Sequence, residues 1–534
     1  MAPLKGRRAK RCCSPGAGEA AGRSQAASEA QGAGETAAKA TPDPLFFPKR
    51  HASYLGILAA FLVVTLVTSS HIDFSFLDAA RDFPGGFAWF VAQFMPDAKA
   101  FDQMDKITSA LAMTILDAIA AGTLAAIISF ILAVVASRVS GVGGPVQMVI
   151  RAFATVLRNI PTVAWGFILL FSFKQAEFTG FLALFFKSLG FLTRAFIETI
   201  DEADAGSIEA LRATGASKLQ VIVHGVLPLS LTQVVSWVLY MIETNFRDAT
   251  LVGMLTGTGI GFVFNWYYRT FKYHTAGLVI VCIAVAVIVV EAASNFVRRR
   301  VGAPDGRQGA RREVRGKLRI RVRTTSGTVF AALVVFLAVA TTYTMVNMGY
   351  GSADTMQAAS DLLEYFKLML LSPSLSHYTW GEMIEGLAVT ICIAVLATAG
   401  GALIALVLSL LAASNLSNKL VSNIVKMLMA VIRSVPTIIW VLVFTVAIGL
   451  GSEAAVIGMM FHTVSFLTKA FSEAFEEVDK GSLEALKATG ATWWQQVARG
   501  VFPDKLNEIL SWIFIRFENN FVGAVTVGAI AGSG

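Results

Sequence analysis

The chain contains a series of apolar runs, each with about 20 residues or more, which is enough to cross the hydrocarbon core of a membrane as a helix. Backbone polar groups find no water in lipid, so such runs must fold as helices or closed barrels. Of all residues, 55% are hydrophobic and only 15% are charged. We therefore predict an all-α polytopic membrane protein with about 11 transmembrane helices. The runs lie near residues 53–70, 109–136, 146–173, 179–198, 229–250, 275–297, 327–347, 384–412, 421–450, 454–473 and 504–527.

One polar segment between these runs occurs twice. Residues 206–228 and 481–503 share 13 of 23 positions at a constant offset of 275. This match indicates a duplication, and the order of the apolar runs predicts two parallel tandem repeats related by an axis along the membrane normal. At the same offset Gly259 matches Gly534, so the second repeat lacks a counterpart of the run at 275–297 and the chain is expected to be C-terminally truncated.

Composition along the chain predicts four parts. Residues 1–44 are rich in Ala, Gly and Ser with scattered basic residues, which is typical of a disordered tail. Residues 45–300 form a first membrane module with about six helices, and residues 326–534 form a second with about five. Residues 301–325 form a basic linker between them.

The placement of charge predicts the orientation in the membrane. Eleven Lys or Arg residues lie between Arg298 and Arg323, against two acidic residues. This excess indicates the cytoplasmic side and contact with membrane lipids rather than with nucleic acid. The segments at 71–108 and 348–383 are acidic and fall on the outer side if the N-terminus is cytoplasmic. The same count places both copies of the repeated polar segment in the cytoplasm.

Each repeated segment carries Glu-Ala, then Gly, then Leu-Pro or Phe-Pro. This pattern resembles the EAA loop of permease subunits in bacterial ATP-binding-cassette importers. The resemblance implies a type I-like transmembrane domain in which the loop forms a short helix that docks on an ATPase subunit. The expected coupling residues are Glu209, Ala210, Gly215, Glu484, Ala485 and Gly490.

Local chemistry agrees with a short helix in each loop. Gly215 and Gly490 can end a helix in a left-handed conformation without a steric penalty from Cβ. Carboxylates before each helix would interact favourably with its N-terminus. These acidic residues are Asp201, Glu202 and Asp204 in one copy, and Glu476, Glu477 and Asp479 in the other.

The flanking motifs narrow the resemblance to phosphonate-type importers. Arg-Asn-Ile-Pro-Thr at 158–162 pairs with Arg-Ser-Val-Pro-Thr at 433–437, and the polar motif at 243–250 pairs with the one that begins at Glu518. The chain therefore resembles two permease subunits fused end to end. The resemblance implies a multi-pass protein of the bacterial plasma membrane, with two ATPase subunits and a soluble or lipid-anchored substrate-binding protein as partners.

Polar residues inside the apolar runs are candidates for a substrate path, because charged groups in a membrane usually face a bundle interior or an aqueous route. An arginine could attract an oxyanion. Arg158 could equally lie at the membrane surface if a helix begins at Pro161, and the Glu and Asn residues could instead join helices. The candidates are Arg158, Arg433, Glu243, Asn245, Arg247, Glu518 and Asn520.

Other motifs limit the function. Gly253, Gly257 and Gly261 recur every four residues, which favours close helix packing. The chain contains no Walker A sequence, so ATP hydrolysis is expected on a separate subunit. Its six histidines lack metal-ligand spacing. We therefore predict a permease that imports phosphonate or a related phosphorus oxyanion, as the resemblance implies. We expect it to have no catalytic site, metal or cofactor. The alternative is an ATP-independent secondary transporter or channel built from parallel repeats.

Overall fold

The structure is a computed structural model that describes residues 46–139, 144–202, 205–301, 325–351, 354–372, 374, 378–449 and 451–531. The predicted tail at 1–44 and residues 302–324 of the predicted linker lie outside them. Contacts divide the chain into two units, 1–66 and 67–534. In the first unit the described residues form most of helix α2 (Phe46–His71). The following paragraphs concern the second unit.

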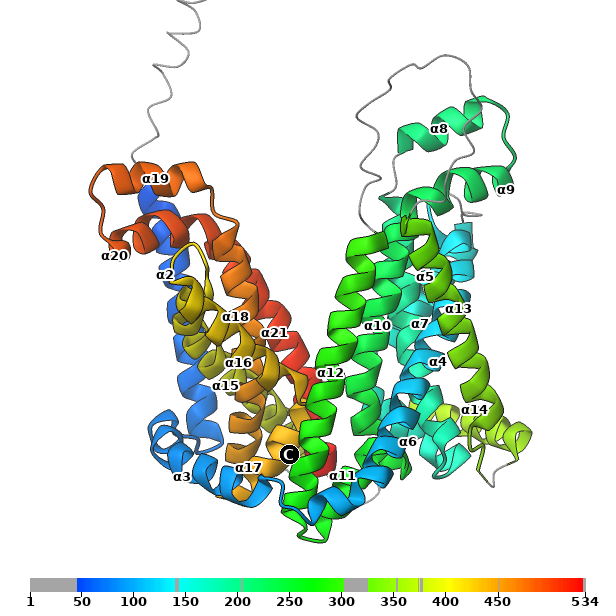
Figure 1. Cartoon of the computed structure of the whole chain (residues 1–534), viewed down its shortest axis with the longest axis horizontal. Coiled ribbons are helices and arrows are strands. Elements are labelled where there is room, and N and C mark those ends of the chain that lie inside the picture. The colour runs from blue at the N-terminus through cyan, green and yellow to red at the C-terminus, as the bar shows by residue number, and fades with distance from the viewer. Residues whose placement is uncertain are drawn as a thin grey trace, which may run out of the picture. The chain divides into compact units, whose positions relative to one another are not determined.

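Helices build the second unit, and no strand occurs in the part of the chain that the structure describes (Figure 1). The elements before residue 302 are α3 (Phe76–Phe94), η1 (Ala100–Gln103), α4 (Met104–Ala136), α5 (Gly144–Asn159), α6 (Thr162–Phe173), α7 (Glu177–Asp201), α8 (Ala205–Ala213), α9 (Lys218–Val221), η2 (Ile222–Val226), α10 (Leu227–Thr256), α11 (Gly259–Arg269) and α12 (Tyr273–Val301). The last two helices pack against each other and against α10.

Two connecting helices, α13 and α14, precede the second copy. The first of them corresponds to the predicted run at 327–347, whereas α14 and α3 lie in the acidic segments at 348–383 and 71–108, which were not predicted to contain helices. The elements after residue 324 are α13 (Thr325–Asn347), α14 (Thr355–Leu371), α15 (Trp380–Ala412), α16 (Lys419–Ser434), α17 (Thr437–Ile448), α18 (Ser452–Glu476), α19 (Lys480–Ala488), α20 (Trp493–Gln496), η3 (Val497–Val501) and α21 (Phe502–Ala531).

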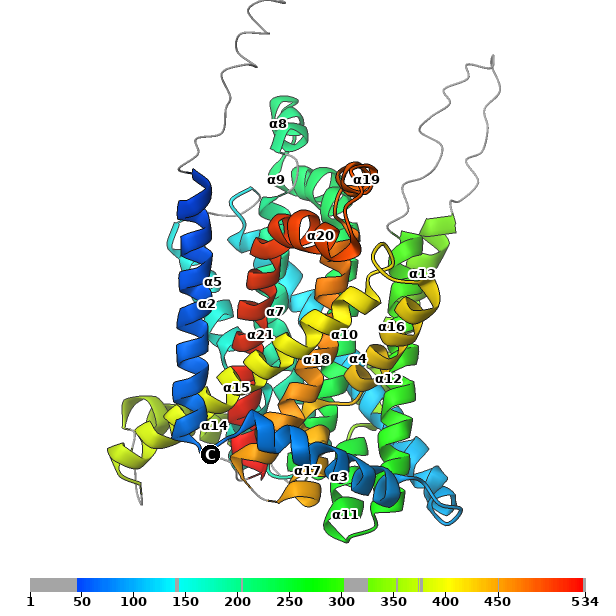
Figure 2. The same cartoon turned by 90° about the vertical axis from the view of Figure 1, so that its left-hand side faces the viewer.

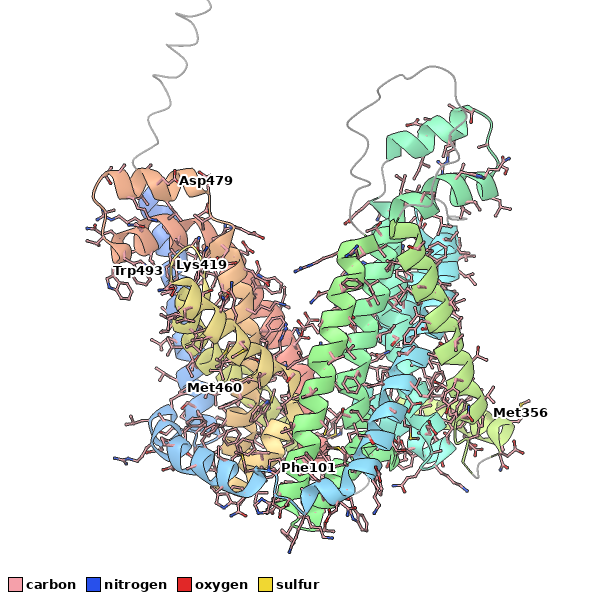
Figure 3. All side chains as sticks on the ribbon, in the orientation of Figure 1. Phe101, Met356, Lys419, Met460, Asp479 and Trp493 are labelled. Carbon is pink, nitrogen blue, oxygen red and sulfur yellow. The ribbon has the colours of Figure 1, made fainter. Side chains whose placement is uncertain are left out.

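The duplication in the sequence is a duplication of structure. The elements from α5 to α10 begin and end 275 positions before the elements from α16 to α21, whereas α4 and α15 are offset by 276. We call α4–α10 the first repeat and α15–α21 the second repeat. The short helices α8 and α19 lie at the same end of the second unit in both views (Figures 1 and 2). In Figure 3, Asp479 and Trp493 lie at this end, whereas Phe101 and Met356 lie at the opposite end. The prediction of an all-α fold with two tandem repeats is confirmed.

Seven helices in the described part of the chain are long and apolar enough to cross a membrane, and three bent helix pairs raise this number to 10. The helix α21 is not among them, although it matches α10 in the repeat. It carries Arg516, Glu518 and two asparagines within its apolar sequence. The count of about 11 runs in the sequence corresponds to these ten spans and α21.

Two predicted spans are broken in the middle. The runs at 146–173 and 421–450 were expected to be single helices, but α5 and α6 meet at 93° and α16 and α17 at 86°. Pro161 and Pro436 stand immediately before α6 and α17. Proline lacks an N–H and disfavours a helical conformation at the preceding residue, so each run bends there. The runs are therefore not continuous helices, and the alternative that a helix begins at Pro161 agrees with the start of α6.

Small residues allow close packing inside each repeat. Helix α4 packs on α7 and α10, and α15 packs on α18 and α21. Ala120, Ala121 and Ala125 of α4 are fully buried. Adding a Cβ to Gly122 would bring it within 3.0 Å of Ile242 Cγ1. In membrane helices, where lipid is as apolar as leucine, such close contacts supply much of the association.

The second repeat is joined to α11 and α12 by packing and by a hydrogen bond. One buried apolar cluster contains Phe264 and Ile283 from α11 and α12, together with Phe444 from α17. The Tyr268 hydroxyl donates a hydrogen bond to the Leu442 carbonyl at 2.9 Å. The region after α10 therefore belongs structurally to the contact between the repeats.

The three glycines near the end of α10 produce a tight helical hairpin, as their spacing predicts. Gly257 ends α10 in a left-handed conformation with φ of +73°. A Cβ at Gly253 would lie 2.4 Å from the Thr258 carbonyl oxygen, and a Cβ at Gly261 would lie 1.8 Å from the Thr250 carbonyl oxygen. The prediction of close helix packing here is confirmed.

Candidate functional site

The repeated polar loops form short helices that end at glycine. Gly215 follows α8 with φ of +81°, and Gly490 follows α19 with φ of +78°. The Gly215 N–H donates to the Arg212 carbonyl at 2.9 Å, and the Gly490 N–H donates to the Lys487 carbonyl at 3.0 Å. Left-handed conformations of this kind are open to glycine without a Cβ clash. The prediction that these glycines end short helices is confirmed.

Each short helix has one face on the protein and one face open. Ile208 of α8 and Leu483 of α19 are only 2% and 5% exposed. The six residues predicted to contact an ATPase are all exposed: Glu209, Ala210, Gly215, Glu484, Ala485 and Gly490. A surface with the same residue types is therefore presented twice, which is what docking of two similar partners requires.

A second pair of glycines holds these helices in place, and the sequence analysis did not single it out. A Cβ at Gly225 would lie 2.9 Å from Leu211 Cδ1, and a Cβ at Gly500 would lie 2.8 Å from Leu486 Cδ1. Both glycines lie in five-residue π-helical segments, η2 and η3. They are among the 13 identical positions of the repeated segment, and this identity was the available signal.

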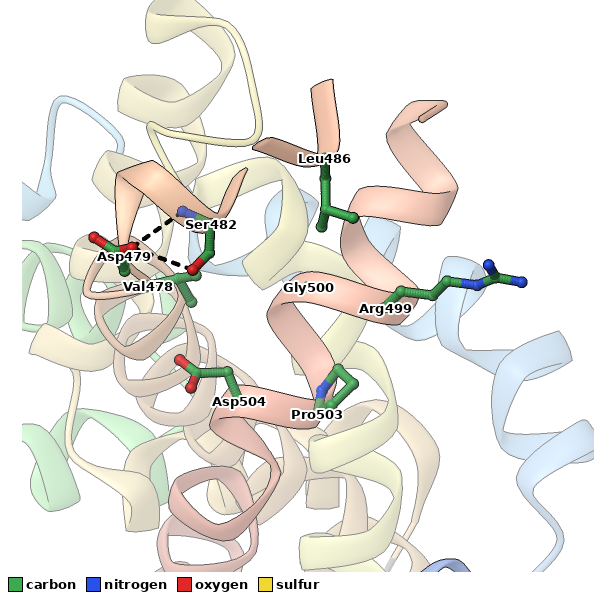
Figure 4. Close-up of a pocket in the computed structure, with 8 residues that line it drawn as sticks. All are labelled: Val478, Asp479, Ser482, Leu486, Arg499, Gly500, Pro503 and Asp504. Atoms are coloured by element: carbon green, nitrogen blue, oxygen red, sulfur yellow. Dashed lines mark hydrogen bonds between the residues drawn. The ribbon is translucent and has the colours of Figure 1, made fainter. Parts of the chain in front are cut away.

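A cavity of about 420 Å³ lies beside α19 in the second repeat (Figure 4). Its lining combines the start of α19 with η3 and the start of α21. The lining residues are Val478, Asp479, Ser482, Leu486, Arg499, Gly500, Pro503 and Asp504. The cavity separates α19 from the first turn of α21. Helix α19 is therefore attached to η3 through the contact of its leucines with Gly500.

The acidic residues before the short helices do not all have the role that was predicted for them. Asp201 pairs with Arg151 at 2.7 Å, and Glu476 pairs with Lys426 at 2.6 Å. Each carboxylate also accepts a backbone N–H just after α4 or α15, at 2.7 Å in both repeats. These carboxylates therefore hold the turns that lead to α5 and α16. Among the acidic residues that the structure describes here, Asp479 caps a short helix, because its carboxylate accepts the Ser482 N–H at 3.0 Å. Its counterpart Asp204 lies outside the described residues.

Asp479→Ala is expected to loosen the start of α19 without unfolding the permease. The hydrogen bonds from Ser482 hold the pKa of Asp479 below its ordinary value of 3.8. The cap is therefore complete at neutral pH and is lost only as pH falls below that value, when the carboxylate takes up a proton. Removing the cap should increase amide hydrogen exchange in α19 roughly fivefold at neutral pH. The matching helix α8 is the internal control, and unchanged exchange in α19 would contradict the prediction.

The two predicted arginines lie at corresponding positions but have different surroundings. Arg158 and Arg433 both stand in the last turn of a helix, just before the bends at Pro161 and Pro436. Arg158 is exposed, and no ion pair is seen for it among the described residues. Arg433 is partly buried and pairs with Glu291 of α12 at 2.5 Å. Arg433 therefore joins the second repeat to α12, whereas Arg158 remains open to other groups.

The predicted glutamates are also unlike each other. Glu243 is buried, and its carboxylate pairs with Arg247 at 3.1 Å and with Arg298 at 3.4 Å. Glu518 occupies the matching position of α21 and is exposed. A carboxylate held between two arginines is electrostatically satisfied. The structure thus brings Glu243 and Arg247 together as an internal pair in the first repeat only.

The two asparagines make the same contact in both repeats. The Asn245 amide donates to Ser188 Oγ at 2.8 Å, and the Asn520 amide donates to Thr463 Oγ1 at 2.9 Å. Asn520 also donates to Thr398 Oγ1 at 2.9 Å. Both asparagines are buried, and their partners lie on neighbouring helices. These hydrogen bonds agree with the alternative that the asparagines join helices.

Sequence reasoning missed two residues in the second repeat. Arg516 of α21 is only 6% exposed. Its Nη2 lies 3.0 Å from Nδ1 of His462, and its Nε donates to Thr463 Oγ1 at 3.2 Å. An arginine in an apolar run was a visible signal, but its repeat partner is Met241, so the comparison of repeats did not select it.

Comparison with known proteins identifies the family. The model of the family described as binding-protein-dependent transport system inner membrane component matches residues 125–303 and 405–534. The chain belongs to this family. The family domain is present twice, which agrees with the repeats, and the expectation of a transport permease rather than an enzyme is confirmed. This permease is a multi-pass inner-membrane protein.

Three similar proteins are permeases whose names refer to phosphorus compounds. The chain is 27% identical to the phosphate-import permease protein PhnE of Mycolicibacterium smegmatis, over 79% of this chain and 76% of that protein. It is 32% identical to the phosphite transport system permease protein PtxC of Stutzerimonas stutzeri, over 35% of this chain and 68% of that protein. It is 36% identical to the putative cryptic phosphonate transport system permease protein PhnE2 of Escherichia coli, over 22% of this chain and 97% of that protein.

Proposed function

We propose that this permease imports a phosphorus oxyanion, phosphonate or a close relative, with energy from two separate ATPase subunits. The observation that carries the proposal is the pair of matched short helices, α8 and α19, each with an exposed face and a glycine at its end. One ATPase would dock on each helix through the residues around Glu209 and Glu484. Closure of the ATPases would then move the transmembrane helices attached to the two loops.

The substrate class is supported by the relatives. The names of three similar permeases specify phosphate, phosphite or phosphonate, which share a tetrahedral phosphorus centre with charged oxygens. Of the residues predicted for the path, Arg158 and Glu518 are exposed and would line it. The others would support the path through their ion pairs and hydrogen bonds: Arg433, Arg247, Glu243, Asn245 and Asn520. A substrate-binding protein would deliver the anion to the end of the permease opposite α8 and α19.

The proposed orientation follows from charge. The basic residues that follow Arg298 would be cytoplasmic, as would the N-terminus and both short helices. The first permease module would comprise residues 45–300 and the second residues 326–534, joined by the basic linker at 301–325. In this orientation the acidic segments at 71–108 and 348–383 face outward.

The experiment that tests the function combines purification with transport. Tagged permease is purified from its native cells, and bound proteins are identified. We expect an ATPase to co-purify, and uptake of phosphite or methylphosphonate to stop when ATP is depleted. Uptake that continues with an intact proton gradient but without ATP, with no ATPase bound, would instead support a secondary transporter.

Arg158→Ala is expected to reduce uptake more than it reduces the amount of permease in the membrane. Arg158 is exposed beside the bend at Pro161, so its loss should remove a positive charge from the path with little effect on packing. We expect uptake to fall roughly tenfold, the value of one charge-assisted hydrogen bond. Arg194→Ala is the matched control, because Arg194 is an exposed arginine paired with Glu198 on its own helix. Equal losses of uptake and abundance would indicate a structural role for Arg158.

A further inference from the structure

A lysine and an aspartate neutralise each other in the core of the first repeat. The Lys187 ammonium contacts the Asp248 carboxylate, and both side chains are mostly buried. Thr162 Oγ1 donates a hydrogen bond to the same carboxylate oxygen at 2.9 Å. The positive charge of Lys187 on α7 is thus compensated from within the repeat by the Asp248 carboxylate of α10, which Thr162 of α6 also contacts.

At the two matching positions, the second repeat has a basic residue but no acidic residue. His462 stands at the position of Lys187, and Gly523 stands at the position of Asp248. Arg516 is added at the position of Met241, seven residues or about two helix turns before Gly523 on α21. The second repeat has therefore gained a guanidinium and lost the carboxylate that the first repeat retains.

Arg516 has only neutral partners among the described residues. It donates hydrogen bonds to Thr463 Oγ1 and toward His462 Nδ1, and its guanidinium lies 5.3 Å from the centre of the Phe466 ring. His462 Nδ1 faces a donor, so its ring proton is on Nε2 if the imidazole is neutral. A buried guanidinium without a counter-ion is costly in a membrane protein.

The nearby arginines are neutralised, which isolates Arg516 further. Arg247 and Arg433 lie close enough to act electrostatically on His462. Arg247 is paired with Glu243, and Arg433 is paired with Glu291. No corresponding carboxylate is paired with Arg516 in the part of the chain that the structure describes. Arg516 is thus a buried cation for which no paired carboxylate is seen among the described residues.

We propose that Arg516 and His462 form a binding station for the phosphorus oxyanion during its passage through the permease. The anion would supply the negative charge that Asp248 supplies in the first repeat. The guanidinium can donate two parallel hydrogen bonds to phosphorus oxygens, and the Nε2–H of His462 can donate another. His462 is partly exposed, so an anion can approach the pair from its side. This inference rests on the proposed function and names a transport site in the second repeat.

The sharpest test adds a competing carboxylate at Gly523. A Cβ at Gly523 meets only the flexible end of Met459, at 3.3 Å, so a small side chain can be accommodated. Gly523→Asp would copy the first repeat and add an internal carboxylate on α21, two helix turns from Arg516. Gly523→Asn has nearly the same shape without the charge. Uptake of phosphite, methylphosphonate and inorganic phosphate is measured in proteoliposomes with the ATPase and binding protein, and rates are normalised to inserted permease.

We expect the Asp variant to import roughly tenfold more slowly than the Asn variant, because the fixed carboxylate competes with the substrate for the same donors. If Arg516 has only a structural role, the Asp variant should instead import faster than the Asn variant, since an added carboxylate would stabilise a buried guanidinium. Gly85→Asp controls for an added charge, because Gly85 lies on α3 with open space around its Cβ position. Arg516→Met, which copies Met241, should also slow uptake roughly tenfold. If this variant does not accumulate, the Gly523 pair still decides the question.

Two results would overturn the inference in different ways. If the wild-type permease imports these anions and the two Gly523 variants do so at equal rates, the station is absent although the proposed function stands. If the wild-type permease imports no phosphorus oxyanion with any ATPase partner, the proposed function fails and the station fails with it.

Discussion

Replacing Gly215 and Gly490 together with valine is expected to reduce ATP-driven uptake roughly a hundredfold while the permease still inserts into the membrane. Both glycines have a left-handed backbone, with φ of +81° and +78°. A β-branched residue in that conformation is strained by about 1–2 kcal/mol. The loop can relieve this strain only by changing its conformation, and each exposed short helix would then turn relative to α9 or α20. The measurement is uptake of labelled phosphite with the amount of inserted permease and of co-purified ATPase.

The matched control for this pair is Gly85→Val. Gly85 also has no atoms within 4 Å of its Cβ position, but its φ lies outside the left-handed region. It lies on α3, at the end of the second unit opposite α8 and α19 (Figure 1). The control should retain uptake. If the double glycine variant imports at the wild-type rate, the loops are not the sites at which ATP hydrolysis is coupled to transport.

Gly261→Ala is expected to prevent normal folding of the permease. A methyl group there would lie 1.8 Å from the Thr250 carbonyl oxygen and 3.0 Å from the Met254 backbone nitrogen. These are backbone atoms of α10, so no side-chain rotation can relieve the contact. Overpacking commonly costs about 1–3 kcal/mol, and a clash with backbone should lie at or above the upper end of this range. The amount of protein in the membrane and its melting temperature in detergent should both fall.

Gly166→Ala is the matched control for this buried substitution. Gly166 is also a buried helical glycine, but its Cβ position meets only Leu255 Cδ1, at 3.4 Å. A leucine methyl group can move by the small amount required, so the melting temperature should change little. Equal effects of the two substitutions would show that the α10–α11 contact is not as rigid as the structure indicates.

Local features of the coupling loops could be predicted because they depend on residues that are neighbours in the sequence. A glycine after a short polar helix predicts a left-handed stop, and φ at Gly215 and Gly490 agrees. The repeat supplied an internal alignment, which selected Asn245 and Asn520 as matched polar positions. The structure shows that both are buried in the same type of interhelical hydrogen bond.

Predictions failed where a partner distant in sequence decides the role. Asp201 was expected to act on the helix that follows it, but it pairs with Arg151, 50 positions earlier in the chain. Glu476 behaves in the same way with Lys426. Pro161 and Pro436 were visible, and a helix start at Pro161 was one alternative, but only the structure shows the bends of 93° and 86°. Hydropathy averages over such bends, so it predicted single spans.

The sequence by itself determined that this protein is helical, membrane-spanning and duplicated. These properties follow from the length of the apolar runs and from the constant offset between the repeats, which need no knowledge of contacts. Only the tertiary structure decided which charges are neutralised. Arg433 finds Glu291 and Lys187 contacts Asp248, whereas Arg516 is buried beside His462 and Thr463. The energy of a charge in a membrane depends on distance and burial, and the fold brings together partners that the sequence separates by 50 residues or more.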